Sequence, residues 1–355
     1  MAGLLQRLLT RSGILPVLRS QWRADQAAAA DKLEQRLEQQ LRDMERMSAE
    51  LTERMRRFEP LLLDSVERIK GTSHEMRVLR ATMMLDIAER RNGAHDPRMF
   101  DPAYVGPHVE RAIGAAPVQT DPSVHIVIND LTPADTYRSI LDGVPPRVFF
   151  TQQDDEKQNL KLSMLNVAPA WTFETLAFLE NTLIPRVMVP ALLRRFEPHI
   201  REFYTREYGR ERGSAFAALP HEATGGRLML RRPGYHLEPH LDPKRVVFTC
   251  LLYFARPGEN EAFGTTFYRM SGTPNIDRTS TFYPQSQGIT CELVKMVPFR
   301  PNTAVAFLNW GGAHGADIPK DAPKDIERYS YQFYVSPEPA ALAALIGEPE
   351  SALAK

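Results

Sequence analysis

Two histidines and one aspartate in the C-terminal third of the chain have the residue types and the spacing to bind a metal ion. His240 and Asp242 stand two residues apart in the segment HLEPHLDPK. Residues i and i+2 of a strand point to the same side, so an imidazole and a carboxylate at this spacing can reach one metal ion. Taken alone, the pair also fits a surface turn beside Pro239 and Pro243.

The third candidate ligand is His314, which follows the apolar run TAVAFLNW and stands in the segment GGAHGA. Its neighbours have almost no side chains, and this leaves room for another group to approach the imidazole. Two histidines and one carboxylate on one face of a β-barrel leave coordination positions open. That set is the facial triad of non-haem iron(II) oxygenases.

A fourth candidate, Arg328, begins the segment RYSYQFYVS. In a strand, alternation places four polar side chains on one face: Arg328, Ser330, Gln332 and Tyr334. A guanidinium inside a barrel is costly unless it meets an anion. A dicarboxylate bound by Arg328 and the Ser330 hydroxyl would supply that anion. The alternative is a salt bridge from Arg328 to Glu327 or Asp325.

The order of these motifs resembles the double-stranded β-helix core of the 2-oxoglutarate and iron(II)-dependent dioxygenases, and is most similar to the prolyl-hydroxylase-like branch. Within about residues 220–337, the segments are PHLD, LLYF, GTTFY, PNTAVAFLN, AHGA and RYSYQFYV. The resemblance implies that His240, Asp242 and His314 bind iron(II). It also implies that Arg328 binds the distal carboxylate of 2-oxoglutarate, and no catalytic acid or base is expected beyond the metal ligands.

The same resemblance implies a reaction. Dioxygen and 2-oxoglutarate would be consumed, succinate and carbon dioxide released, and an unactivated C–H bond hydroxylated. Prolyl hydroxylases usually have a tyrosine three residues before the first ligand and a lysine as the anchor, whereas this chain has Leu237 and Arg328. Tyr235 and Tyr253 are the candidates for the missing hydroxyl. The sequence leaves the substrate open between a peptide side chain and a small metabolite.

Hydrophobic patterning predicts the elements that position these residues. After Gly226, short apolar runs rich in β-branched and aromatic residues alternate with Gly, Pro and Asn turns, which predicts an all-β C-terminal third. Upstream, we expect a strand over 124–131, a short helix over 133–144 and a long helix over 172–208. The predicted fold class is α+β: a jelly-roll core with flanking helices and an N-terminal helical or coiled extension.

The N-terminal extension is predicted to cover residues 1–95. Apolar residues at heptad spacing between Leu37 and Leu62 predict a short coiled coil, which would pack against the chain's own catalytic domain or form a homodimer. Pro60 is expected to kink or restart the helix, and a capping box at Thr72 to begin a second helix. The other predicted divisions are a linker at 96–125, an oxygenase domain at 126–340 and a tail at 341–355.

Two segments are candidates for contact with the substrate. Residues 270–287 form either a lid over the metal or an ordinary surface loop. Residues 145–162, which include two adjacent phenylalanines followed by acids and amides, either line the mouth of the site or form an edge strand.

Composition excludes several partners. Lys+Arg and Asp+Glu are equal at 44 each, which argues against nucleic acid and anionic membranes. Two cysteines, Cys250 and Cys291, are too few for a disulfide framework, so a reducing compartment, the cytoplasm, is expected. No apolar run is long enough to predict a transmembrane helix. Residues 1–24 are rich in Arg and Leu without acids, and they predict either an amphipathic first helix or a mitochondrial transit peptide.

Two other classes of function fit parts of the pattern. A cupin-like metal-binding β-barrel without oxygenase activity would share the triad, but would have no need of an inward-facing Arg328 and Ser330. A scaffold protein acting through its N-terminal helices would tolerate the loss of His240. Failure to bind 2-oxoglutarate would favour the first alternative, and function retained without His240 would favour the second.

Overall fold

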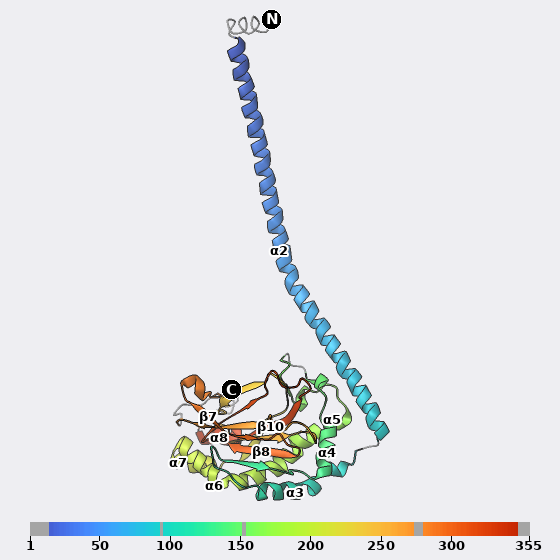
Figure 1. Cartoon of the computed structure of the whole chain (residues 1–355), viewed down its shortest axis with the longest axis vertical. Coiled ribbons are helices and arrows are strands. Elements are labelled where there is room, and N and C mark those ends of the chain that lie inside the picture. Colours follow the sequence, from blue (N-terminus) through green and yellow to red (C-terminus); the bar gives the residue numbers. More distant parts are fainter. Residues whose placement is uncertain (1–13, 93–94, 151–153, 273–279, 347–355) are drawn as a thin grey trace. The chain divides into compact units, whose positions relative to one another are not determined.

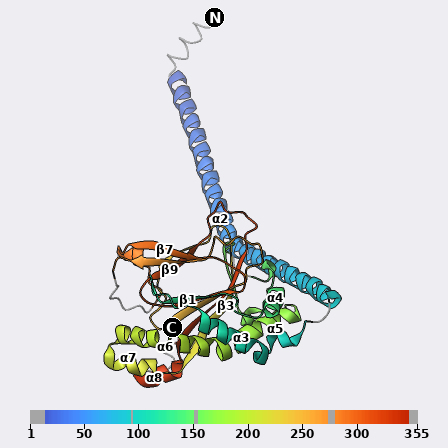
Figure 2. The same cartoon turned by 60° about the horizontal axis from the view of Figure 1, so that its bottom comes forward.

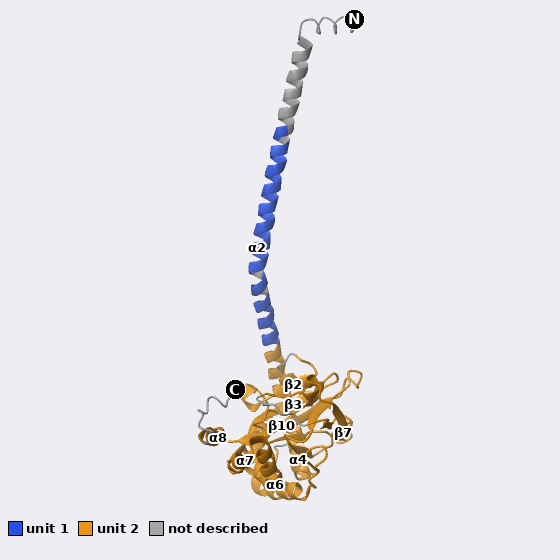
Figure 3. Ribbon diagram, turned by 90° about the vertical axis from the view of Figure 1, so that its left-hand side faces the viewer, with its two compact units in different colours: residues 1–73 blue, residues 74–355 orange. Residues whose placement is uncertain are grey.

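A computed structural model of the chain divides it into two compact units, residues 1–73 and residues 74–355 (Figure 3). The described residues are 14–92, 95–150, 154–272 and 280–346. Parts of several predicted segments lie outside these ranges: 1–13 of the candidate targeting segment, 93–94 of the N-terminal extension, 151–153 of the segment 145–162, 273–279 of the candidate lid, and 347–355 of the tail.

One helix, α2 (Ile14–Asn92), replaces the two helices expected in the N-terminal extension (Figure 1). Pro60 lies inside it and does not restart it. Residues with high helix propensity continue on both sides of the proline, and ion pairs between residues four apart, such as Arg57–Glu53 at 3.1 Å, support the turns nearby. The Thr72 hydroxyl donates to the carbonyl of Arg68 at 3.0 Å. It therefore continues the helix instead of capping a new one.

The heptad positions of α2 present apolar side chains to solvent in the single chain. Leu37, Leu41, Met44, Leu51 and Met55 are each between 57% and 72% exposed. The side chains of the last two heptad positions, Phe58 and Leu62, lie outside the description. The coiled coil and the homodimer therefore stay predictions.

The second unit contains two antiparallel sheets. The six-stranded sheet has the order β1 (His125–Ile128), β8 (Thr303–Leu308), β5 (Phe248–Tyr253), β10 (Arg328–Pro337), β3 (His221–Arg231) and β2 (Lys157–Leu160). The four-stranded sheet has the order β4 (His236–His240), β9 (Ala313–Asp317), β6 (Thr265–Met270) and β7 (Cys291–Val297). The mixture of helices with antiparallel sheets agrees with the predicted α+β class.

Helices cover the outer face of the six-stranded sheet (Figure 2). They are α3 (Pro102–Ala115), α4 (Ala134–Gly143), α5 (Ala170–Phe178), the π-helical η4 (Leu179–Met188), α6 (Val189–Tyr208) and α7 (Arg210–Ala217), with α8 (Pro339–Ile346) near the C-terminus. Short 3-10 turns lie at Pro97–Phe100, Arg147–Phe149, Leu162–Met164 and Pro284–Gln287. The run Ala170–Tyr208 has a window apolar enough for a membrane span, but 56% of that window is buried in the fold, as in a core helix.

The predicted linker at 96–125 is wrong, because α3 occupies most of it and packs into the core. Val105, Val109 and Ile113 recur every fourth residue and are buried, so they form an apolar stripe along one side of the helix. The Asp101 side chain accepts a hydrogen bond from the backbone N–H of Ala103 at 2.8 Å, which caps the helix. Proline and glycine in this segment suggested a linker, but the helical spacing of its apolar residues decides the structure.

Strands β5 and β8 of the six-stranded sheet are buried along their whole length on both faces, which explains their continuous apolar sequences FTCLLY and TAVAFL. On β5, Phe248, Cys250 and Leu252 face the helices. The alternate residues Leu251 and Tyr253 face the smaller sheet. The space between the two sheets holds the side chains that were predicted to carry the chemistry.

Phe248 joins the helix layer to the sheet, since its ring lies 5.7 Å from that of Phe196 on α6. Phe248→Ala should lower the free energy of unfolding by about 3–5 kcal/mol, because it leaves a cavity in a packed layer. Leu293→Ala, on an exposed strand position, should change it by less than about 0.5 kcal/mol. Urea unfolding followed by circular dichroism measures both. Equal effects would show that this contact does not hold the layers together.

Candidate active site

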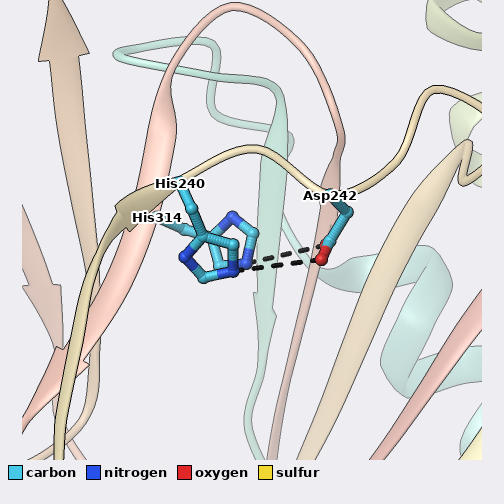
Figure 4. Close-up of side chains that lie close together, drawn as sticks. All are labelled: His240, Asp242 and His314. Atoms are coloured by element: carbon cyan, nitrogen blue, oxygen red, sulfur yellow. Dashed lines mark ion pairs between the residues drawn. The ribbon is translucent and has the colours of Figure 1, made fainter. Parts of the chain in front are cut away.

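Strand register brings the three candidate metal ligands together. His240 on β4 is paired with His314 on β9, and directly opposed residues on neighbouring strands project from the same face. Asp242 follows two residues after His240. The carboxylate oxygens of Asp242 lie 3.9 Å from His240 Nε2 and 3.6 Å from His314 Nε2 (Figure 4). All three ligand atoms lie within 4.8 Å of one another.

Burial makes this cluster suitable for a cation. The side chains of His240, Asp242 and His314 belong to residues that are only 5%, 2% and 6% exposed. Burial, together with the nearby His240, holds the pKa of His314 well below its usual value, so its imidazole is neutral at pH 7. A neutral imidazole binds metal ions, and a buried carboxylate is stable when a cation neutralises it. Two nitrogen donors and one carboxylate fit iron(II).

Neighbouring polar groups orient the ligands. His240 Nδ1 lies 2.9 Å from the Glu238 carbonyl, where it can donate a hydrogen bond and leave Nε2 to face the metal position. The Thr249 hydroxyl donates to Asp242 Oδ2 at 2.6 Å. The Asn309 side-chain amide donates to the carbonyls of Asp242 and Pro243, both at 2.9 Å. Thr249 and Asn309 were not predicted from the sequence, because their role is recognisable only once β5 and the end of β8 lie beside Asp242.

The Thr249 hydroxyl should set metal affinity through Asp242. Thr249→Val keeps the shape of the buried side chain and removes the hydrogen bond. We expect iron(II) affinity to fall about 10- to 100-fold, the usual effect of losing a group that orients a ligand. Anaerobic calorimetric titration with iron(II) measures it.

The matched control is Thr303→Val, a buried threonine on β8 whose hydroxyl donates to the Pro301 carbonyl. Its iron affinity should stay within about twofold of the unmodified protein. Unchanged affinity in Thr249→Val, or equal losses in the two variants, would contradict an orienting role for Thr249.

Arg328 is buried near the triad, at the start of β10. Its guanidinium lies over the rings of Phe299 and Tyr253, at 5.1 and 5.6 Å. Nη1 donates to the Phe263 carbonyl, and Nε has no hydrogen-bond partner among the described residues. Burial lowers the pKa of Arg328, which reflects the cost of a charge removed from water.

The alternative salt bridge from Arg328 does not form in the described part of the chain. No ion pair joins it to Glu327 or Asp325; instead Glu327 accepts a hydrogen bond from the Tyr329 hydroxyl at 3.1 Å. A buried guanidinium that contacts only carbonyls and rings can still bind an anion.

The other predicted site residues lie around Arg328. Ser330 is fully buried, and its hydroxyl has no hydrogen-bond partner among the described residues. The Tyr253 hydroxyl donates to Thr265 Oγ1 at 2.6 Å and accepts from the Thr265 N–H at 3.0 Å. Tyr253 thus presents its ring to Arg328, while its hydroxyl is bound within the protein. Tyr235 lines the cavity between the sheets.

That cavity has a volume of about 430 Å³ and connects the triad with Arg328. Four basic residues that the sequence analysis missed also line it: Lys157, Lys161, Arg227 and Arg231. Strand alternation in the segment RLMLRR could have shown that Arg227 and Arg231 share a face with Met229. Lys157 lies on the neighbouring strand β2 and Lys161 directly after it, in the segment 145–162 that was expected to line the mouth of the site or form an edge strand, but neither lysine was predicted as a site residue.

Both candidate substrate segments contribute to the cavity. In 145–162, β2 forms the edge strand of the large sheet and also carries lining residues, so the two expectations for this segment both hold. In 270–287, Phe282 forms two backbone hydrogen bonds of 2.9 Å with Leu241, next to Asp242. Thr281 and Tyr283 then line the cavity.

No family model matches the chain, and no curated protein matches it. Solved structures do. A Pseudomonas putida prolyl-4-hydroxylase is 14% identical, with 65% of this chain and 97% of that chain covered and a TM-score of 0.32. A Phytophthora capsici prolyl 4-hydroxylase is 14% identical (74% and 76% covered, TM-score 0.34). HygX from Streptomyces hygroscopicus, with nickel and 2-oxoglutarate bound, is 14% identical (61% and 84% covered, TM-score 0.33). The structures that resemble this chain thus include prolyl 4-hydroxylases and a protein that binds 2-oxoglutarate.

Proposed function

We propose that this protein is a 2-oxoglutarate- and iron(II)-dependent dioxygenase that hydroxylates an unactivated C–H bond. The observation that carries the proposal is one cavity that contains a buried two-histidine, one-aspartate cluster and a buried arginine without an acidic partner among the described residues. A metal barrel of another kind would use the cluster but not Arg328.

The strand order supports a jelly-roll core in residues 220–337. From β3 to β10 the chain crosses repeatedly between the sheets: β3, β5, β8 and β10 belong to the larger one, and β4, β6, β7 and β9 to the smaller. Two facing four-stranded sheets connected in this way fit the double-stranded β-helix. In this proposal β1, β2 and the helices of 97–217 extend and support the core of the oxygenase domain. That domain is proposed at 126–340, and α3 packs against it from the preceding segment.

The residues of the chain then have distinct tasks. His240, Asp242 and His314 would hold iron(II) on one face, which leaves positions for the cosubstrate and dioxygen. Arg328 and Ser330 would bind the distal carboxylate of 2-oxoglutarate through their unpartnered buried Nε and Oγ atoms. When bound, iron(II), 2-oxoglutarate and dioxygen supply oxidative decarboxylation to succinate and carbon dioxide, coupled to hydroxylation. The rings of Tyr253 and Phe299 exclude water around the anchor.

Anaerobic titration of the iron(II) protein with 2-oxoglutarate tests the proposal, since chelation of the keto acid gives a visible charge-transfer absorption. Asp242→Ala should abolish both this absorption and succinate formation in air, because it removes one of only three protein ligands.

Asp317→Ala is the control, since it removes an exposed carboxylate from the same strand as His314, where it contacts His236. It should retain the absorption. If the unmodified protein binds iron(II) but never shows the band, the cupin-like alternative replaces the oxygenase.

Arg328 should affect 2-oxoglutarate affinity without affecting iron affinity. Arg328→Gln should raise the dissociation constant for 2-oxoglutarate about 100-fold, because it removes charge-assisted hydrogen bonds to a carboxylate in a dry site. Arg328→Lys retains the charge and should lose less. Calorimetry on the iron(II) protein under nitrogen measures both constants, and unchanged 2-oxoglutarate affinity in Arg328→Gln would rule out this anchor.

A further inference from the structure

We propose that the hydroxylated substrate is a small organic anion with at least two negative charges, bound by Lys157, Lys161, Arg227 and Arg231. We call these four residues the basic row. The inference rests on the proposed function, because it assigns the basic row to the substrate that is hydroxylated, and 2-oxoglutarate to Arg328.

Strand pairing places the basic row on one surface. Lys157 on β2 pairs with Arg231 on β3. Arg231 in turn pairs with Arg328 on β10. Alternation puts Arg227 on the same face of β3 as Arg231, and Lys161 on the same side of the chain as Lys157. All four line the cavity that contains the triad.

The buried member of the row has neutral partners only. Arg231 is 4% exposed, and its guanidinium donates to the Gln158 carbonyl at 2.6 Å and to Asn159 Oδ1 at 2.8 Å. Its Nε has no hydrogen-bond partner in the described ranges. Burial lowers the pKa of Arg231. A charge held in this way is stabilised when an anion binds beside it.

Arg227 also lacks an acid. It donates to Gln332 and to the Tyr334 hydroxyl, the latter at 3.1 Å. Arg232, which does not line the cavity, differs: it pairs with Asp155 at 2.6 Å and with Glu327 at 3.7 Å. Within the described parts of the chain, no member of the basic row forms such an ion pair. Among the described residues, the arginine that follows β3 outside the cavity thus has acidic partners, whereas the two arginines of the basic row have none.

The charge balance favours an anionic substrate. Among the lining residues that the structure describes, Asp242 is the one acid, against Arg328 and the basic row. Iron(II), Asp242, Arg328 and a 2-oxoglutarate dianion together carry no net charge. None of these groups compensates the positive charges of the basic row. The substrate that is hydroxylated would therefore need at least two negative charges to neutralise most of the row.

Cavity size and residue chemistry define the class of substrate. About 430 Å³ suits a small molecule rather than a folded protein surface. Arginine forks and lysine ammonium groups bind both phosphate and carboxylate oxygens. The shared chemistry is thus that of a phosphate ester or a polycarboxylate, with the exposed Lys157 and Lys161 at the rim, and Arg231 deeper.

The test uses the full-length protein loaded anaerobically with iron(II) and saturated with 2-oxoglutarate. Glycerol 3-phosphate and tricarballylate are titrated in turn by calorimetry, with glycerol as the neutral probe. At least one anionic probe should bind, and binding should weaken at high salt because the rim charges are screened. Glycerol should not bind, and the stronger anionic probe identifies which headgroup the row prefers.

Lys157→Gln/Lys161→Gln should weaken probe binding about tenfold, which corresponds to the loss of two partly exposed charge contacts. Its 2-oxoglutarate affinity should stay within about twofold. The control Arg194→Gln/Arg201→Gln removes two exposed charges from α6, on the other side of the large sheet, and should leave probe binding unchanged. Because the lysines are exposed, this variant tests the row without disturbing a buried residue.

The outcomes separate the two proposals. Binding of 2-oxoglutarate without either anionic probe, or equal probe binding by the two double variants, overturns the anionic substrate and leaves the oxygenase intact. Probe binding that depends on the lysines, in a protein that does not bind 2-oxoglutarate, supports the anion site and overturns the oxygenase.

Discussion

Charges buried between two sheets are the constraint on which the structure depends. Asp242 and Arg328 both lie where water is excluded, and each is stable only if a charge of opposite sign reaches it. They do not neutralise each other directly. The Thr249 hydroxyl donates to the Asp242 carboxylate and the Asn309 amide to the Asp242 backbone carbonyl, while the Arg328 guanidinium donates to a backbone carbonyl. The interior is therefore organised to receive a cation at one position and an anion at the other.

The register of the antiparallel strands decides which of these buried side chains lie opposite each other. The β4–β9 pairing sets His240 against His314, and the β10–β3 pairing sets Arg328 against Arg231. Each pair consists of like groups, which would repel if both were charged. The histidine pair avoids this because burial and the nearby His240 lower the pKa of His314, which keeps the His314 imidazole neutral. The arginine pair cannot do so, because guanidinium groups stay protonated, and an anion between or beside them is the remaining solution.

The sequence predicted those site residues that can be recognised from a short segment of the chain. His240 and Asp242 are two residues apart. Alternation along β10 predicted that Arg328 and Ser330 share one face and that Tyr331 lies on the other; Arg328 lines the cavity between the sheets, and Tyr331 packs in the core on the helix side.

The site residues that the sequence did not predict are positioned by the pairing of strands and the packing of segments around them. Asn309 and Lys157 reach their neighbours in the site only through segments far along the chain, whereas Thr249 contacts Asp242 across seven residues. The expected helix break at Pro60 and the expected linker at α3 were wrong for a different reason. In both segments, helix propensity or the helical spacing of apolar residues outweighed the effect of individual prolines.

Lys157 of the basic row and the metal ligand His314 belong to differently paired strands of the sheets. β2 is an edge strand, hydrogen-bonded along one side only, to β3. His314, by contrast, lies on β9, which is paired on both sides, and the edge strand β4 that carries His240 is held in register by its pairing with β9. Substitutions on an edge strand disturb few neighbours. Evolution could therefore change the anion that this protein selects by altering β2, while the metal-binding strands and their register are inherited unchanged.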